Sequence, residues 1–96
     1  MGEMAVMSEL QIERNMPKVR GWKRVGTTIK KRVVKKDFIK AMAYVQSVAF
    51  VSEHADHHPD IDIRWNTVTL VLTTHSEGGL TEKDFSLAAR INSLTS

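Results

Sequence analysis

Apolar side chains recur at helical spacing through residues 38–55, after a run of basic residues. One side of this segment holds Phe38, Ala41, Met42, Val45, Val48 and Ala49. Asp37 is a favourable N-cap, because its carboxylate can accept a hydrogen bond from the first turn. We therefore predict a long helix that packs on a sheet. Its further apolar residues, Ile39, Ala43, Phe50 and Val51, are expected to contact a neighbouring subunit or the N-terminal segment.

Strict alternation of apolar and polar residues follows this helix and predicts two strands. Ile61, Ile63 and Trp65 alternate with polar residues over residues 61–66, the period of a half-buried strand. Asn66 and Thr67 then form a tight turn. Residues 68–74 are rich in β-branched side chains, which strands favour, so His75 should lie at the end of the second strand.

Two shorter β-prone runs, residues 20–25 and 28–34, flank Gly26 and Thr27 and predict an earlier hairpin. Its inner face should carry Ile29 and Val33 beside the stem of Lys31. Before it, residues 8–14 predict a short helix capped by Ser8.

Thr81 and Asp84 match a capping box that opens a last helix over residues 82–94. The expected order is therefore short α-β-β-α-β-β-α. This order predicts an α+β fold in which helices pack on one face of a four-stranded antiparallel sheet. We expect one domain over residues 1–96, because a chain of 96 residues leaves no room for a second.

The amino-acid composition argues against three kinds of protein: disulfide-rich, thiolate-metal and membrane-spanning. The chain has no cysteine, so it can form neither a disulfide framework nor a thiolate metal site. It has no long apolar run, which predicts neither a signal peptide nor a membrane span. We therefore expect a cytoplasmic protein.

Charge is distributed unevenly along the chain. Residues 1–52 carry 11 basic and 4 acidic side chains, whereas residues 53–96 carry 3 basic and 7 acidic ones. Such a basic half raises the possibility of nucleic-acid binding. The basic residues alternate with apolar ones along a hairpin, however, and Trp22 is the one aromatic residue among them. A solvated surface is the simpler interpretation, and we do not expect a nucleic-acid partner.

Three histidines lie at the ends of predicted elements, where a side chain can point into a cleft. These residues, His57, His58 and His75, suit proton transfer because imidazole titrates near neutral pH. Glu53 lies one helical turn before His57 and is predicted to orient it. Pro59 disfavours helical geometry at the preceding residue, so the two adjacent histidines should point differently.

The spacing of these residues resembles the pterin-4a-carbinolamine dehydratase family. The pattern consists of Glu53, His57, His58, Pro59, Trp65, His75 and Asp84. Gly21-Trp22 and the segment from Lys36 to Phe38 also resemble the family, and the resemblance covers about residues 16–95. Family members usually begin with a longer N-terminal helix than this chain predicts.

The resemblance implies an activity, the dehydration of a 4a-hydroxytetrahydropterin to a quinonoid dihydropterin. It implies that His57 and His75 supply the acid and the base, that His58 binds substrate, and that no metal or redox cofactor takes part. Further residues expected to line or shape the pterin site are Glu53, Asp56, Pro59, Trp65, Thr73, Thr74, Ser76 and Asp84.

Other interpretations of these residues stay open. His54 and His58 are four residues apart and could bind a metal with His75 or Asp56, although Pro59 argues against this. Asp84 could serve only as a helix cap. Trp65 is expected to pack on the inner strand face and to shape the pocket wall.

The resemblance also leaves a second class of function open. Relatives of this fold act as dimerisation partners of transcription factors and as assembly factors, so a non-enzymatic binding role is the alternative. We expect a homodimer or homotetramer, because a small sheet exposes edge strands that need covering.

Overall fold

The computed structural model describes residues 5–94, and its elements follow the predicted order. The helices are α1 (Glu9–Asn15), α2 (Phe38–Ala55) and α3 (Glu82–Asn92), with two short 3₁₀ helices, η1 (Met16–Lys18) and η2 (His75–Glu77). The strands are β1 (Lys23–Val25), β2 (Thr28–Val34), β3 (Asp60–Arg64) and β4 (Thr67–Leu72). Within residues 5–94, no helix is long and apolar enough to cross a membrane.

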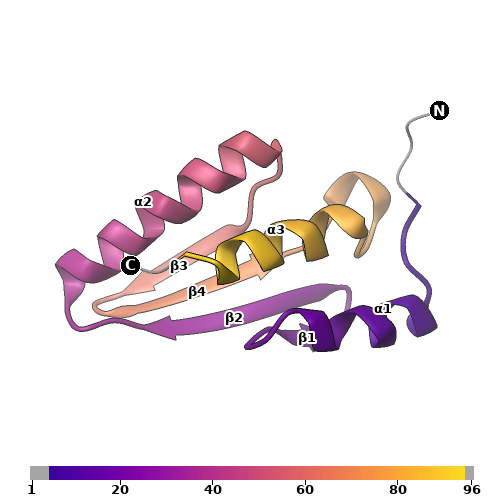
Figure 1. The fold of residues 1–96 in the computed structure, drawn as a ribbon, viewed down its shortest axis with the longest axis horizontal. Helices are drawn as coiled ribbons and strands as arrows, with labels where there is room; N and C mark the ends of the chain where they lie inside the picture. The colour runs from indigo at the N-terminus through magenta and orange to yellow at the C-terminus, as the bar shows by residue number, and fades with distance from the viewer. Residues whose placement is uncertain (1–4, 95–96) are drawn as a thin grey trace.

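The four strands form one antiparallel sheet in the order β1-β2-β4-β3. Ile29 of β2 and Leu72 of β4 are direct cross-strand partners, and both are completely buried. Figure 1 shows α2 and α3 lying across the sheet on one side. The predicted α+β fold is therefore confirmed, and the core lies between this face and the two helices.

The predicted boundaries of the second hairpin were wrong by one or two residues. Arg64 pairs with Thr67, so Trp65 and Asn66 form the two-residue turn. Trp65 has φ 53° and is 68% exposed, and it does not pack in the core. Side-chain alternation continued through this turn in the sequence, which is why periodicity alone extended the strand to residue 66.

Helix α2 begins as predicted, with the Asp37 carboxylate accepting a hydrogen bond from the backbone N–H of Lys40 at 2.8 Å. Its buried residues are Ala41, Tyr44, Val48 and Ser52. The predicted apolar side was partly wrong, because Phe38, Met42 and Ala49 are exposed. A helix with apolar residues on most sides has no single stripe to identify its buried face.

A polar cluster ties the first hairpin to the end of α3. Trp22 Nε1 and Lys31 Nζ both donate to Asn92 Oδ1, at 3.0 and 2.6 Å. The predicted inner position of Lys31 beside the buried Ile29 is thereby confirmed. Burial lowers the pKa of Lys31, and the charge of Lys35 lowers it further.

Candidate active site

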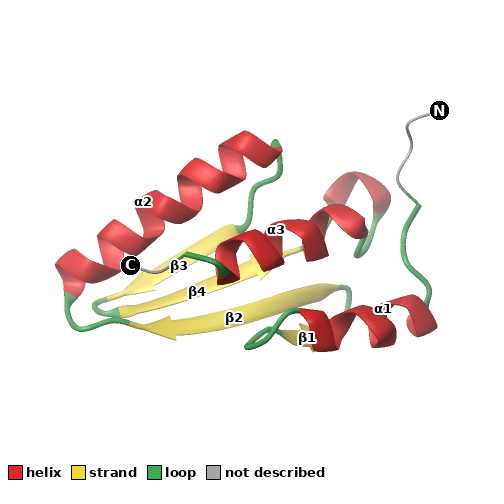
Figure 2. Cartoon of the chain, viewed as in Figure 1, coloured by secondary structure: helices red, strands yellow, loops and turns green. Residues whose placement is uncertain are grey.

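The three predicted histidines line one hollow of about 320 Å³, at the end of the sheet where α2 and β4 both stop. Figure 2 shows the loops after these two elements at the same end of the molecule. Pockets that bind small molecules begin at about this size. The residues that line the hollow are Asp56, His57, His58, Thr73, Thr74, His75, Ser76 and Lys83. Folding therefore brings together the loop after α2, the loop and η2 after β4, and the first turn of α3.

His57 is held by a buried carboxylate. Its Nε2 lies 2.6 Å from Oδ1 of Asp84, and the side chain of Asp84 is completely buried. The His57 side chain is 11% exposed. A buried carboxylate needs several donors to stay in the protein interior, and His57 supplies one of them.

Two threonines satisfy the other oxygen of Asp84. The Thr74 hydroxyl donates to Oδ2 at 2.8 Å, and the backbone N–H of Thr81 donates to the same oxygen at 2.9 Å. The two threonine hydroxyls are themselves 2.8 Å apart. The Thr81–Asp84 capping box is therefore confirmed, and the same carboxylate also faces the hollow through His57. The Asp84 side chain therefore both caps α3 and holds His57 in place.

This network assigns the tautomer of His57. A carboxylate offers only acceptors, so Nε2 of His57 is the donor in the pair. In the neutral ring the lone pair then lies on Nδ1, which has no hydrogen-bond partner within residues 5–94. Nδ1 of His57 is thus able to accept a proton, and the Asp84 carboxylate would lie beside the resulting imidazolium.

The prediction that Glu53 orients His57 was wrong. Glu53 instead lies beside His58, with Oε2 and Nε2 3.0 Å apart. Helix α2 ends because Asp56 adopts a left-handed conformation, φ 52° and ψ 44°, which turns His57 away from the helix face of Glu53. The Glu53 and His58 side chains are 75% and 58% exposed, so this pair contributes little to stability.

His75 is the first residue of η2, in the segment between β4 and α3. Strand β4 ends at Leu72, earlier than predicted, and Thr73 follows with its hydroxyl donating to the Thr27 carbonyl at 2.7 Å. His75 is exposed to solvent. Its imidazole can therefore exchange protons with water directly.

Four expected site residues do not line the hollow. Asp84 and Glu53 do not line it themselves, but each pairs with a histidine that does. Trp65 lies in the β3–β4 turn, whereas the hollow adjoins the opposite end of β3. The expectation that it shapes the pocket wall is therefore not supported by this fold. Pro59 lies between His58 and β3 and contributes the bend rather than a lining surface.

Lys83 is a lining residue that sequence reasoning missed. It lies in the first turn of α3, and its Nζ donates to the Asp56 carbonyl at 3.4 Å. This contact joins the start of α3 to the end of α2 beside the histidines. The one available signal was its position between Thr81 and Asp84 of the capping box.

The metal interpretation required His54 and His58 to lie on one helix face. Helix α2 stops at Ala55, so His58 has left the helix, and the ring of His54 instead packs edge-on against Phe50 with centroids 5.8 Å apart. Across residues 5–94 there is no group of three or more His, Asp or Glu side chains that could hold a metal ion.

Comparison with known proteins gives a consistent family. The family model described as Pterin 4 alpha carbinolamine dehydratase matches residues 5–94. The chain is 50% identical over 88 residues to a protein of Roseiflexus sp. (strain RS-1), covering 92% of this chain and 95% of the relative. It is 45% identical over 91 residues to a protein of Mycobacterium sp. (strain KMS), covering 95% and 97%. Both relatives are provisionally named pterin-4-alpha-carbinolamine dehydratase.

Two solved structures share the fold. A transcriptional coactivator/pterin dehydratase from Brucella melitensis superposes with a TM-score of 0.86 at 31% identity, covering 91% of this chain and 95% of that one. A pterin dehydratase-like protein identified as a RuBisCO assembly factor in the alpha-carboxysome gives 0.64 at 24% identity, covering 76% and 87%. The second likeness shows the fold alone.

Proposed function

Because the chain belongs to the pterin-4a-carbinolamine dehydratase family, we propose that it dehydrates a 4a-hydroxytetrahydropterin to a quinonoid dihydropterin and water. This step regenerates a pterin cofactor after the hydroxylation of an aromatic amino acid. The observation that carries the proposal is the convergence of three histidines on one hollow, with His57 bonded to the buried Asp84.

In the proposed mechanism, the reaction needs one proton acceptor and one proton donor. The C4a–O bond breaks, a proton leaves the adjacent ring nitrogen, a C=N bond forms, and the departing hydroxyl takes up a proton to become water. We assign the acceptor to Nδ1 of His57, because the Asp84 carboxylate stabilises the imidazolium that forms. We assign the donor to His75, because its exposed ring is reprotonated by solvent.

The remaining lining residues are proposed to bind the heterocycle. His58, supported by Glu53, lies next to His57 on the α2 side of the hollow. Asp56, Thr73, Thr74 and Ser76 supply polar groups for the amide edge of the pterin, and Lys83 closes the α3 side. None of these tasks needs a redox cofactor, since no electrons are transferred in the net reaction.

The direct test is dehydration of a 4a-hydroxytetrahydropterin that is generated enzymatically in the cuvette. We expect the purified chain to accelerate the ultraviolet change that accompanies quinonoid product formation. Treatment with a chelator should leave the rate unchanged, because the proposed steps use only imidazoles and solvent. A rate equal to that in buffer would remove the dehydratase proposal.

The alternative is a non-enzymatic binding or assembly function on the same fold. One of the two structural neighbours is described as a transcriptional coactivator and the other as an assembly factor, which keeps this class of function in consideration. The paired His57 and Asp84 favour the enzyme, because a binding function alone does not require a buried carboxylate–imidazole pair. Partner binding without any acceleration of dehydration would favour the alternative.

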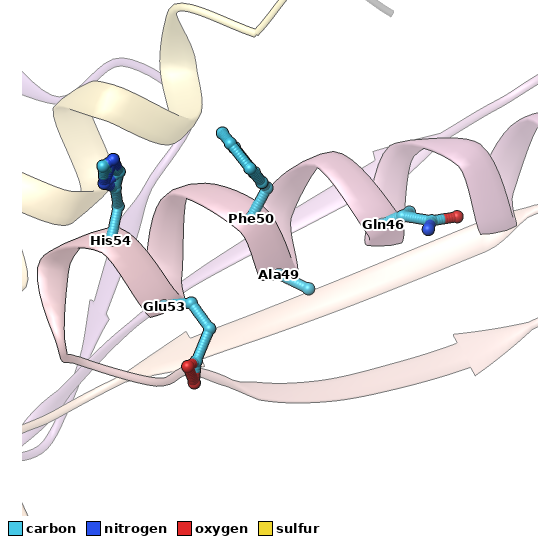
Figure 3. A pocket seen from close by; sticks show the side chains of 5 residues that line it. All are labelled: Gln46, Ala49, Phe50, Glu53 and His54. Atoms are coloured by element: carbon cyan, nitrogen blue, oxygen red, sulfur yellow. The ribbon is translucent and has the colours of Figure 1, made fainter.

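We also propose that the outer side of α2 packs against α2 of a second copy. This side carries Ile39, Met42 and Phe50, which are 77%, 43% and 72% exposed. Beside Phe50 lies an open groove of about 550 Å³, shown in Figure 3, in which Phe50 and His54 project from the same side of the helix. Large exposed apolar patches of this kind mark contact surfaces.

Charge and spacing favour a second copy as the occupant of this side. If two α2 helices pack antiparallel, with the two-fold axis crossing the outer side of the helix at the level of Tyr44, Ile39 of one copy would face Phe50 of the other. The same pairing would place Lys36 near the acidic Glu53 of the second copy. Opposite charges across the ends of the contact set its direction and register.

Sedimentation velocity tests this contact. Phe50→Glu should dissociate the assembly, because it buries a charge against Ile39 of the second copy. The double variant Ile39→Lys/Phe50→Glu should restore it by forming two opposite-charge pairs. Val25→Glu, at an exposed apolar position on β1, is the control. Dissociation by the control, or an unchanged size for Phe50→Glu, would exclude α2 as the interface.

A further inference from the structure

The loop that carries His75 is closed at its base. Residues 74–79 begin and end in a backbone pair, in which the Thr74 N–H donates to the Gly79 carbonyl at 3.0 Å and the Gly79 N–H donates back at 3.4 Å. Gly78 turns the chain with φ 77°. The base of the loop thus sets where η2, and with it His75, lies relative to β4.

A segment from the other end of the chain packs on the outside of this base. The backbone N–H of Met7 donates to the Leu80 carbonyl at 2.8 Å. Figure 1 shows the indigo segment before α1 passing on the same side of the molecule as the orange loop between β4 and α3. Ser8 follows at once as the cap of α1, so the segment is anchored immediately after this contact.

Gly79 permits this approach because it has no side chain. A Cβ at Gly79 would lie 2.6 Å from Cγ2 of Val6, closer than real Cβ atoms approach other heavy atoms. Gly79 is buried and its φ is not positive, so the backbone conformation does not itself require glycine. The requirement comes from Val6.

The contact is adjacent to both threonines that hold Asp84. Leu80 is 1% exposed and precedes Thr81, while Gly79 pairs with Thr74, and these two threonines bond to the Asp84 carboxylate. Movement at the loop base would therefore displace His75 and loosen the support of His57 together.

We propose that residues 6–7 form a strap that positions His75, with Gly79 as the positioning residue that receives it. This inference rests on the proposed dehydratase function for its kinetic consequence. Its structural consequence, restraint of residues 75–79 by the N-terminal segment, does not depend on any activity. The two consequences are measured separately.

The experiment compares wild type, Val6→Ala, Gly79→Ala and the double variant Val6→Ala/Gly79→Ala in the full chain. Amide hydrogen exchange of residues 75–79 should be about tenfold faster in Gly79→Ala, since a displaced strap lowers the free energy of local opening. Val6→Ala should show a smaller increase. The double variant should return toward wild type, because the alanine methyl at position 79 takes the space that Val6 vacates.

Kinetics then test positioning of the imidazole. Gly79→Ala should reduce kcat by about fivefold with a smaller change in KM, because the geometry of proton transfer is affected more than binding. In a His75→Ala background the same substitution should have a smaller effect, because only the support of His57 is then left to change. Val34→Ala, at an exposed valine that pairs with Thr67 at the end of β2 away from the hollow, is the control and should change neither measurement.

Exchange of residues 75–79 at the wild-type rate in both single variants would overturn the strap. A double variant whose exchange is as fast as that of Gly79→Ala, or faster, would also overturn it. Equal loss of activity on adding Gly79→Ala to wild type and to His75→Ala would overturn its action through His75. If wild type shows no dehydration at all, the function fails while the exchange data still decide the strap.

Discussion

Replacing His57 by glutamine should lower kcat for dehydration by about 10²–10⁴-fold, the usual contribution of a positioned acid or base. The glutamine amide can still donate a hydrogen bond to the buried Asp84 carboxylate, so the free energy of unfolding should change little. The amide cannot accept a proton, which separates catalysis from folding. Stopped-flow absorbance gives the rate, and urea denaturation gives the stability.

His54→Gln is the matched control, because His54 lies on the outer groove of α2 rather than on the hollow. We expect it to keep the wild-type rate. His57→Ala should lose activity as His57→Gln does. It should also have a lower free energy of unfolding, since it removes one of the donors to a fully buried carboxylate. A His57→Gln protein that is folded and retains most of its activity would contradict the assignment of the proton acceptor.

Converting Asp84 to asparagine should lower kcat by about 10²–10⁴-fold, as loss of the carboxylate partner of a catalytic histidine does elsewhere. The asparagine carbonyl would take the place of Oδ2, because Thr74 and Thr81 both donate there. Its NH₂ group would then face Nε2 of His57. That ring must become the Nδ1–H tautomer, which cannot accept a proton at Nδ1.

The double variant His57→Gln/Asp84→Asn should be no slower than the slower single variant, because the two residues act as one unit. Asp37→Asn is the control for the helix-capping function. Asp37 caps α2 with a carboxylate as Asp84 caps α3, but it lies outside the hollow, so its variant should retain full activity. Equal activity losses for Asp37→Asn and Asp84→Asn would indicate a purely structural function for Asp84.

Much of the fold was predictable because each element has a local signal. The capping residues Ser8, Asp37 and Thr81 marked the start of the three α-helices within residues 5–94, and alternation in residues 61–72 marked the second hairpin. Predictions failed where a local pattern was ambiguous. Trp65 continued the strand alternation although it lies in a turn, and the many apolar residues of α2 concealed which side is buried.

The identities and order of the histidines, read against the family pattern, were determined by the sequence, and so were the layer arrangement and the Thr81–Asp84 cap. Partner choice within the site was decided only by the tertiary structure. Spacing assigned Glu53 to His57, but the left-handed turn at Asp56 moved His57 to Asp84, 27 residues away, and left Glu53 to His58. The contact of Val6 with Gly79 was likewise invisible in the sequence. The physical reason is that periodicity reports which face of an element is buried, whereas side-chain pairing depends on how the ends of separate elements meet in space.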